Sequence, residues 1–119
     1  MPARLQIDCV TIDQTMDAYQ RIVGVGGPNL PGIAPPDTSR IVAELRRRGL
    51  PFREKARWAL STHDAIEGIL AETWSFYIHL GAYDIVDVQL ATSPAGRPYL
   101  RTAVDRDTPD ELLFLARCR

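Results

Sequence analysis

Strict alternation of apolar and polar residues between positions 73 and 104 constrains the fold more than any other feature of this sequence. The stretch TWSFYIHLG has an apolar residue at every second position from Trp74 to Leu80, and DIVDVQLATS and RPYLRTAVD repeat the pattern. A period of two is typical of β-strands that bury one face. Because turn residues separate the three stretches, at 81–84 and 93–96, we expect three consecutive antiparallel strands.

Two further strands are expected near the N-terminus. Residues 5–12 (LQIDCVTI) and 18–25 (AYQRIVGV) are rich in β-branched residues and predict a hairpin. The glycines at 24, 26 and 27 are expected to end the second of these strands. Residues 28–36 (PNLPGIAPP) contain four prolines and predict a loop.

Three segments predict helices. Residues 39–48 (SRIVAELRRR) place their apolar residues on one face and three arginines in the last turn, where cations favour the helix dipole. Ser61 and Asp64 have the spacing of a capping box and begin a second helix. A close approach of that helix to the sheet would explain Gly68 in its interior. Residues 108–111 (TPDE) predict the start of a short C-terminal helix.

Together these elements predict an α+β fold, with a mainly antiparallel sheet of about five strands, two helices on one face and a short C-terminal helix. We expect a single domain over residues 1–119, in which residues 29–61, a proline-rich loop and a helix, form an insertion. The chain is 45% hydrophobic and 24% charged, as expected for a soluble globular protein. Its net charge of −1 provides no field that would attract nucleic acid or an anionic membrane.

The two cysteines, Cys9 and Cys118, are too few for a disulfide framework and have no metal-ligand spacing. Both lie among apolar residues, so we expect buried free thiols. Free thiols favour a cytoplasmic location. A membrane-spanning run and a signal peptide are not expected, since the sequence contains neither pattern.

The C-terminal string YLRTAVDRDTPDELLFLARC carries a family resemblance. An aromatic and an aliphatic residue, Arg-Thr, Asp, a Leu pair and a terminal Cys occur here as Tyr99, Leu100, Arg101, Thr102, Asp105, Leu112, Leu113 and Cys118. This pattern resembles the ending of a family of small bacterial proteins, catalogued as domain of unknown function thirty-eight ninety-two. The chain departs from the family at Glu111 and Ala116, and it lacks His in the second strand. The resemblance implies an α+β fold and no particular activity.

Two groups of residues on the predicted sheet are candidates for ligand binding. Arg101 could bind a carboxylate or phosphate through both of its terminal nitrogens, with Thr102 and Asp105 beside it. The alternative is a structural ion pair across the sheet, with Asp105 or Asp87. Tyr77 and His79 are expected on the outward face of the same sheet. The ligand-binding candidates are therefore Arg101, Thr102, Asp105, His79 and Tyr77.

The segment RRRGLPFREKARW (46–58) combines six basic residues with two aromatic ones. Grooves that bind nucleic acid interleave cations and stacking platforms in this way. The alternative is a solvated helix end and a loop whose aromatic residues anchor it to the core, and we favour that alternative. The residues that would contact nucleic acid are Arg46, Arg47, Arg48, Arg53, Lys55, Arg57 and Trp58.

The sequence favours a non-enzymatic binding or assembly module. It contains no convergent set of titratable groups that would indicate an active site, and it predicts no catalytic residues, metal or cofactor. We expect a homodimer, formed through a sheet edge or the face bearing Tyr77 and Tyr99, with an unknown protein or small molecule as further partner. Two alternatives stay open: a nucleic-acid-associated accessory protein acting through 46–58, and a small hydrolase or isomerase using His79 and Asp87.

Overall fold

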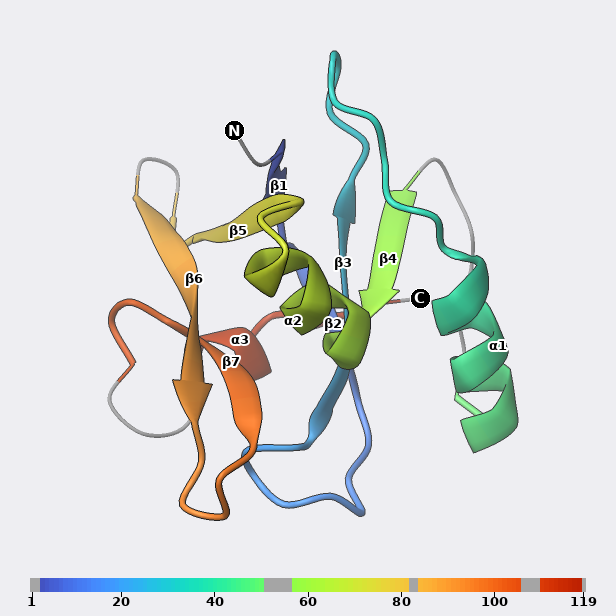
Figure 1. Cartoon of the computed structure of the whole chain (residues 1–119), viewed down its shortest axis with the longest axis vertical. Coiled ribbons are helices and arrows are strands. Elements are labelled where there is room, and N and C mark those ends of the chain that lie inside the picture. Colours follow the sequence, from blue (N-terminus) through green and yellow to red (C-terminus); the bar gives the residue numbers. More distant parts are fainter. Residues whose placement is uncertain (1–2, 51–56, 82–83, 106–109, 119) are drawn as a thin grey trace.

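A computed structural model of the chain describes residues 3–50, 57–81, 84–105 and 110–118, which form two four-stranded sheets and three helices (Figure 1). The first sheet has the order β1–β5–β6–β7, formed by Ala3–Gln6, Trp74–His79, Ile85–Thr92 and Pro98–Thr102. The second has the order β4–β3–β2–β8, formed by Arg57–Ser61, Ile22–Pro28, Cys9–Ile12 and Ala116–Arg117. The helices are α1 (Ser39–Arg48), α2 (Thr62–Leu70) and α3 (Asp110–Leu113).

The first sheet contains the three alternating strands in the predicted antiparallel order. Phe76, Ile78 and Leu100 are buried on its inner face. The register pairs Tyr77 with Asp87 and Gln89 with Arg101 on the opposite face. The alternation therefore predicted the strands and the face that each one buries, but Leu80 and Val104, expected on the inner face, follow the ends of β5 and β7 and are exposed.

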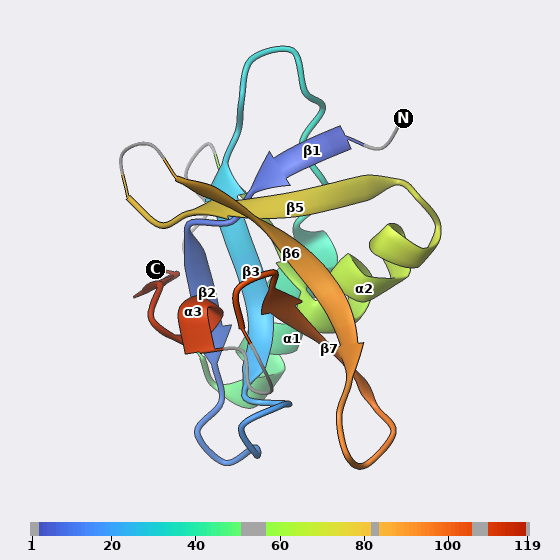
Figure 2. The same cartoon turned by 90° about the vertical axis from the view of Figure 1, so that its left-hand side faces the viewer.

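The predicted strand 5–12 is two strands, which belong to different sheets. Leu5 lies in β1, which pairs in parallel with β5, and Ile7 still donates its backbone N–H to Tyr77 O at 2.9 Å. Asp8 instead donates to Gly26 O at 3.0 Å, and β2 continues in the second sheet. The chain passes from β1 to β2 within two residues, and Figure 2 shows the two strands running in different directions. A content of β-branched residues indicates strands but not the change of partner.

The second predicted strand, 18–25, is displaced along the chain. Asp17 Oδ1 accepts hydrogen bonds from the backbone N–H groups of Tyr19 and Gln20, which makes this region a turn. Strand β3 begins at Ile22 and runs through the glycines to Pro28. A Cβ on Gly27 would overlap the Gln6 carbonyl. Glycine here permits the crossing of the chain between the sheets rather than ending the strand.

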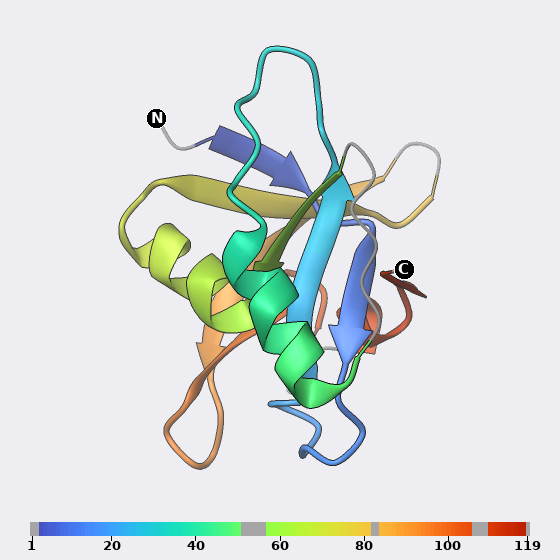
Figure 3. The same cartoon turned by 90° about the vertical axis from the view of Figure 1, so that its right-hand side faces the viewer.

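The predicted helices 39–48 and 61 onward are confirmed. Helix α1 buries Ile41 and Leu45 against β4 and its neighbours (Figure 3). Ser61 caps α2, accepting the Asp64 N–H at 3.0 Å. A Cβ on Gly68 would overlap the Trp74 indole, so α2 does approach the first sheet closely at that position. The predicted start of the C-terminal helix at 108 lies outside the described residues, and α3 is described from Asp110.

The architecture is α+β as predicted, but it differs from a single five-stranded antiparallel sheet. Both sheets are mixed, because β1 pairs in parallel with β5 and β8 pairs in parallel with β2. Helix α2 contacts strands of both sheets, and one apolar cluster joins the two sheets. Strand β4 falls within the predicted insertion 29–61, yet it pairs with β3 over its length. None of the described helices is long and apolar enough to cross a membrane.

The prediction of two free thiols is wrong, because Cys9 and Cys118 form a disulfide, with their Cα atoms 4.9 Å apart. The two cysteines are 109 positions apart in the sequence, so their spacing gave no signal. Pairing of β8 with β2 brings them together, and the Cys118 N–H donates to Val10 O at 3.0 Å. Sequence alone cannot supply the Cα separation that a disulfide requires.

Candidate functional site

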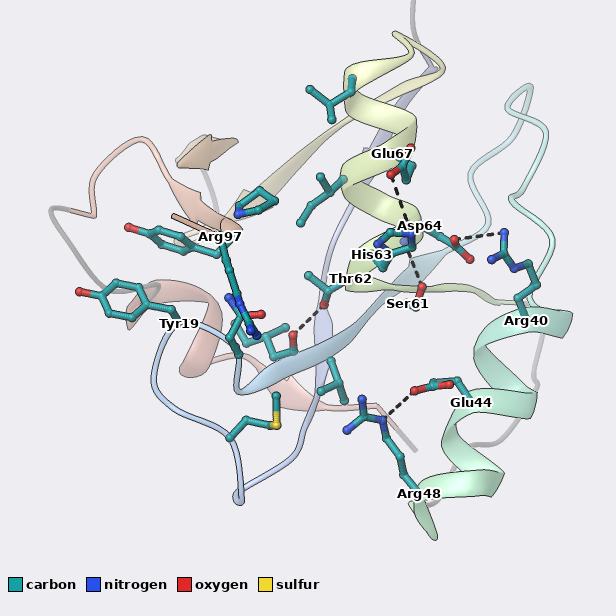
Figure 4. Close-up of a pocket in the computed structure, with 18 residues that line it drawn as sticks. Tyr19, Arg40, Glu44, Arg48, Ser61, Thr62, His63, Asp64, Glu67 and Arg97 are labelled. Carbon is teal, nitrogen blue, oxygen red and sulfur yellow. Dashed lines mark hydrogen bonds and ion pairs between the residues drawn. The ribbon is translucent and has the colours of Figure 1, made fainter. Parts of the chain in front are cut away.

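A cavity of about 600 Å³ lies between α1, α2, the loop before β3 and the turn between β6 and β7. Figure 4 shows Arg40, Glu44 and Arg48 facing it from α1 and the first turn of α2 bordering it from above. Ile22, Ile66 and Tyr99 provide apolar surface. The volume is within the range of pockets that hold small molecules.

The turn between β6 and β7 positions Arg97 at this cavity. Ser93 fixes the turn through three hydrogen bonds: its N–H donates to Arg97 O, its carbonyl accepts from Gly96 N, and its Oγ accepts from Arg97 N. Gly96 has a φ of +82°, a conformation that favours glycine. The Arg97 side chain extends from this fixed backbone into the cavity near Tyr19 (Figure 4).

The other two arginines of the cavity are paired with carboxylates. Arg40 Nη1 lies 3.2 Å from Asp64 Oδ1, and His63 Nε2 lies 3.8 Å from Glu67 Oε1. Arg48 Nε lies 2.9 Å from Glu44 Oε1. In the described part of the chain, Arg97 has no carboxylate partner. It is therefore the cation of this cavity that a ligand can engage without breaking an ion pair.

Helix α1 is joined to the loop before β3 through Arg48. Besides Glu44, its guanidinium contacts Asp13 Oδ2 at 2.7 Å. The hydrogen bond from Arg48 is the main reason that the pKa of Glu44 is lowered, and Arg47 adds to it. The pKa of Asp13 is also lowered, chiefly by hydrogen bonds from Thr15 and further by Arg48. These carboxylates are therefore charged at neutral pH and hold this wall in place.

The hydroxyl groups of the cavity serve the fold. Ser61 Oγ caps α2, and Thr62 Oγ1 donates to Ile22 O at 2.8 Å. Among the described residues neither hydroxyl is hydrogen-bonded to His63, whose side chain is 75% exposed. A nucleophile needs a base within hydrogen-bonding reach. Within the described residues, Ser61 and Thr62 therefore lack the hydrogen-bonded base that a nucleophile needs.

Two tyrosines form the wall opposite the helices. The rings of Tyr19 and Tyr99 meet edge to face with their centroids 5.0 Å apart. This contact explains why Tyr99 is 4% exposed, although its strand position predicts an outward side chain. The same pair borders a second, smaller cavity of about 390 Å³, which Ser93 and Arg101 also line.

The predicted group Arg101, Thr102 and Asp105 is only partly brought together. Asp105 Oδ2 accepts from the Thr102 N–H at 2.9 Å and from Thr102 Oγ1 at 3.0 Å, and its Oδ1 accepts from Glu111 N at 3.2 Å. Thr102 is completely buried. These two residues tie the end of β7 to α3, whereas Arg101 lies on the opposite face of the sheet. Arg101 remains a candidate ligand residue of the second cavity.

Tyr77 and His79 lie side by side on the outer face of the first sheet, with ring centroids 5.7 Å apart. The Arg4 guanidinium lies 4.8 Å above the Tyr77 ring and 2.7 Å from Asp87 Oδ1. Neither Tyr77 nor His79 lines either of the two cavities. Asp87, the proposed partner of His79 in a small hydrolase, is thus engaged by Arg4.

The basic segment 46–58 does not present an aromatic platform at Trp58. Trp58 is 1% exposed and stacks on Phe76 in the core, with centroids 5.6 Å apart. Arg57 forms an ion pair with Asp8, and Arg47 forms one with Glu44. Arg46 is exposed at the end of α1. Arg53 and Lys55 lie outside the described residues. The described part of the segment supports the structural interpretation.

Sequence reasoning missed Arg97, Tyr19, Arg40 and Asp64 as cavity residues. The turn at 93–96 was predicted, but a turn signal does not indicate what the following side chain faces. Tyr19 was assigned to a strand, which concealed the loop that places it against Tyr99. The spacing of Ser61 and Asp64 predicts a helix start. That helix start forms the α2 side of the cavity, and its capping pattern is the one sequence signal that points to the site.

The fold and site define a small α+β protein with two mixed sheets and a cavity between its helices and turns. No group of three or more side chains suited to hold a metal ion occurs among the described residues. A model of the family described as "Protein of unknown function (DUF3892)" matches residues 6–116, and the chain belongs to this family. No curated protein and no solved structure matches the chain.

Proposed function

We propose that this protein is a non-enzymatic binding module that holds a small anion with an apolar body in the 600 Å³ cavity. The observation that supports this proposal most is Arg97, a cation without a carboxylate partner in the described structure, fixed at the cavity by the Ser93 turn. Arginine binds carboxylates and phosphates through charge-assisted hydrogen bonds. Ile22, Ile66 and Tyr99 provide the surface for an apolar body.

The charge balance of the cavity favours an anion that carries few charges. Arg40 and Arg48 are paired with Asp64 and Glu44, which leaves Arg97 to attract an anion. Glu67 on α2 adds a further negative charge to the lining. A polyanion would bring further negative charge close to the carboxylates on α1 and α2, which costs free energy. A monocarboxylate or a phosphate monoester with an aromatic or aliphatic body carries few charges and also supplies an apolar surface.

Titration followed by NMR tests this function, using benzoate and phenyl phosphate as probes and benzyl alcohol as the neutral analogue. We expect the two anions to shift resonances of residues around the cavity, with benzyl alcohol at least tenfold weaker. Comparison of the two anions distinguishes a carboxylate from a phosphate preference. Equal binding of benzyl alcohol would contradict the proposal.

The matched variants are Arg97→Ala and Arg46→Ala. Both remove an exposed arginine, but Arg46 lies outside the cavity. A lost charge-assisted hydrogen bond lowers affinity by roughly tenfold or more. We expect that loss for Arg97→Ala and unchanged affinity for Arg46→Ala. Unchanged affinity in both variants would show that the cavity does not use Arg97.

We also propose self-association as a dimer through the outer face of the first sheet, for which Ile85, 54% exposed, supports an apolar contact. Tyr99 cannot contribute as predicted, since Tyr19 covers it. Sedimentation equilibrium at micromolar concentration tests this, and a monomer mass at every loading would exclude it.

A cytoplasmic location stays a prediction, but the disulfide removes the support that free thiols gave it.

A further inference from the structure

The Cys9–Cys118 disulfide lies where the last described residues of the chain join the second sheet. Cys9 belongs to β2, which has β3 on one side and β8 on the other. Cys118 follows β8, a strand of two residues at the edge of that sheet (Figure 2). Cys9 is 7% exposed and Cys118 is 8% exposed. The two cysteines are therefore equally buried. Cys9 lies in an inner strand of the sheet, whereas Cys118 follows a two-residue strand at its edge.

The inner side of the disulfide is closed by β3. A Cβ on Gly26 would lie 3.0 Å from Cys9 Sγ and 3.1 Å from Cys118 Sγ. Such distances are tighter than ordinary carbon–sulfur contacts, so the absence of a side chain at Gly26 makes room for the sulfurs. A group added to Cys9 would have to fit within the sheet. A group added to Cys118 can be accommodated by displacing β8, a two-residue strand at the edge of the sheet.

Arg57 makes the two sulfurs chemically different. Its Nη2 donates to Cys9 Sγ at 3.8 Å, while the same guanidinium forms an ion pair with Asp8. A neighbouring cation stabilises a thiolate and lowers the pKa of the corresponding thiol. In the part of the chain that the structure describes, Cys118 Sγ has no such cation. Cys9 is therefore the better leaving group when the disulfide is cleaved.

We propose that Cys118 is a site of reversible S-thiolation by small-molecule thiols. A thiolate forms a bond to Cys118 Sγ, the Cys9–Cys118 bond breaks, and its electron pair goes to Cys9, which leaves as a thiolate beside Arg57. One disulfide is exchanged for another, so the step needs no oxidant or reductant beyond the thiol. Attack by the Cys9 thiolate on the mixed disulfide reverses the step and expels the small thiolate.

The contacts that this reaction breaks first are those of β8 and Cys118. Displacing Cys118 breaks the hydrogen bond from its N–H to Val10 O, and further movement would break the short pairing of β8 with β2. Leu112, which is completely buried in the main apolar cluster, precedes this segment and can stay in place. Thiolation would thus release the end of the second sheet and leave the core assembled.

The test uses the oxidised full-length protein with reduced glutathione as the probe. Samples are quenched with acid at intervals, free thiols are alkylated, and the adduct is located by mass spectrometry of peptides. We expect the glutathione on Cys118 and the alkyl group on Cys9, with a preference of at least tenfold. Adduct mainly on Cys9, equal adduct on both, or no adduct at all would overturn the proposal.

Variants of Arg57 and Asp8 test the cause of the preference. Arg57→Ala should slow adduct formation severalfold and reduce the preference for Cys118, and Arg57→Lys should restore part of both. Asp8→Asn frees Arg57 from its competing carboxylate, so adduct should form faster than in the wild type. Arg46→Ala is the matched control and should react like the wild type. If Arg57→Ala fails to fold, the Asp8→Asn rate decides, and an unchanged or slower rate counts against the role of Arg57.

Discussion

The two sheets of this protein differ in whether their strands are buried on one face or on both. This difference explains which strands can be predicted from the sequence. Strand β5 alternates buried Phe76 and Ile78 with outward residues, because one face of the first sheet faces solvent. In β2 the residues from Cys9 to Thr11 are all buried, and in β3 burial is nearly continuous. A strand covered on both faces loses its alternation, so the clearest sequence signal marks the exposed sheet.

The sheets also differ in how far apart in the sequence their paired strands lie. The first sheet is made mostly of successive strands joined by short connections. The second combines strands from both ends of the chain, and the Cys9–Cys118 disulfide joins those ends. Local contacts thus assemble β5, β6 and β7, although β1 joins them from a distant part of the chain. In the second sheet β2 and β3 pair locally, whereas β4 and β8 join them over longer sequence separations. The following predictions test this difference, beginning with the largest expected effect.

Removing the disulfide should weaken the second sheet strongly. For the double variant Cys9→Ala/Cys118→Ala we expect a loss of about 3 to 5 kcal/mol in the free energy of unfolding, because a cross-link that closes a loop of about 100 residues restricts the unfolded chain. Urea unfolding without reductant measures it. The wild type with reductant should approach the variant. A loss below about 1 kcal/mol would show that the second sheet does not depend on the link.

Gly68→Ala tests how closely α2 packs on the first sheet. Alanine is the better helix former by roughly 1 kcal/mol, yet its Cβ would overlap the Trp74 indole, which also donates to Ala65 O at 3.1 Å. We expect overpacking to prevail, with a net loss of about 2 kcal/mol.

A double-mutant cycle separates overlap from a general effect on the helix. In the background of Trp74→Leu, Gly68→Ala should cost much less or become stabilising, because the ring is gone. Equal losses in both backgrounds would contradict the packing explanation. Urea unfolding monitored by circular dichroism suits all four proteins.

Asp105→Ala should loosen the end of the first sheet. The Thr102 N–H and hydroxyl would lose their acceptor in a fully buried position, at a cost of about 2 kcal/mol. Asp87→Ala is the matched control, since it removes an exposed carboxylate from the same sheet and should cost about 0.5 kcal/mol or less. Chemical denaturation of both variants checks the difference, and equal losses would contradict it.

The smallest expected effect is the pH dependence of the ion pairs that Glu44 forms with Arg47 and Arg48 on α1. The pKa of Glu44 is lowered in the folded protein. Its contribution to stability is present above its ordinary pKa of about 4.5 and is lost as the pH falls through the lower folded value.

Glu44→Gln measures this contribution. The variant should lose at most about 0.5 kcal/mol near neutral pH, because the groups are partly exposed. It should also show a smaller loss of stability than the wild type between about pH 5 and pH 3. The same pH dependence in both proteins would mean that Glu44 does not contribute.

The sequence predicted local structure well, but it predicted poorly which strands pair with one another. The alternation at 74–79, the helix at 39–48 and the cap at Ser61 depend on neighbouring residues, and all three are confirmed. The change of sheet after Ile7 depends on which strand accepts the next hydrogen bond, which no local pattern encodes. Glycines in a sequence predict the end of a strand, whereas those of β3 lie within it and leave room for tertiary neighbours such as Gln6.

The candidate site shows the same limit. Its wall at Ser61 and Asp64 coincides with a predicted helix start, but Arg97 and Tyr19 reach the cavity from separate turns. Arg101 and Thr102 are adjacent in the sequence and were grouped, yet the pleat of β7 sends them to opposite faces. A cavity assembled from several distant segments becomes visible only when the tertiary structure is known.

The disulfide also makes the polypeptide from Cys9 to Cys118 a closed covalent ring. One cut by a protease anywhere within it, for example in the proline-rich loop, would open the ring without separating two fragments. Such a nicked protein would keep its mass, apart from one added water, until a reductant divided it. After such a cut, the disulfide would still link Cys9 in β2 to Cys118 after β8. The second sheet would therefore keep a covalent link between its distant segments.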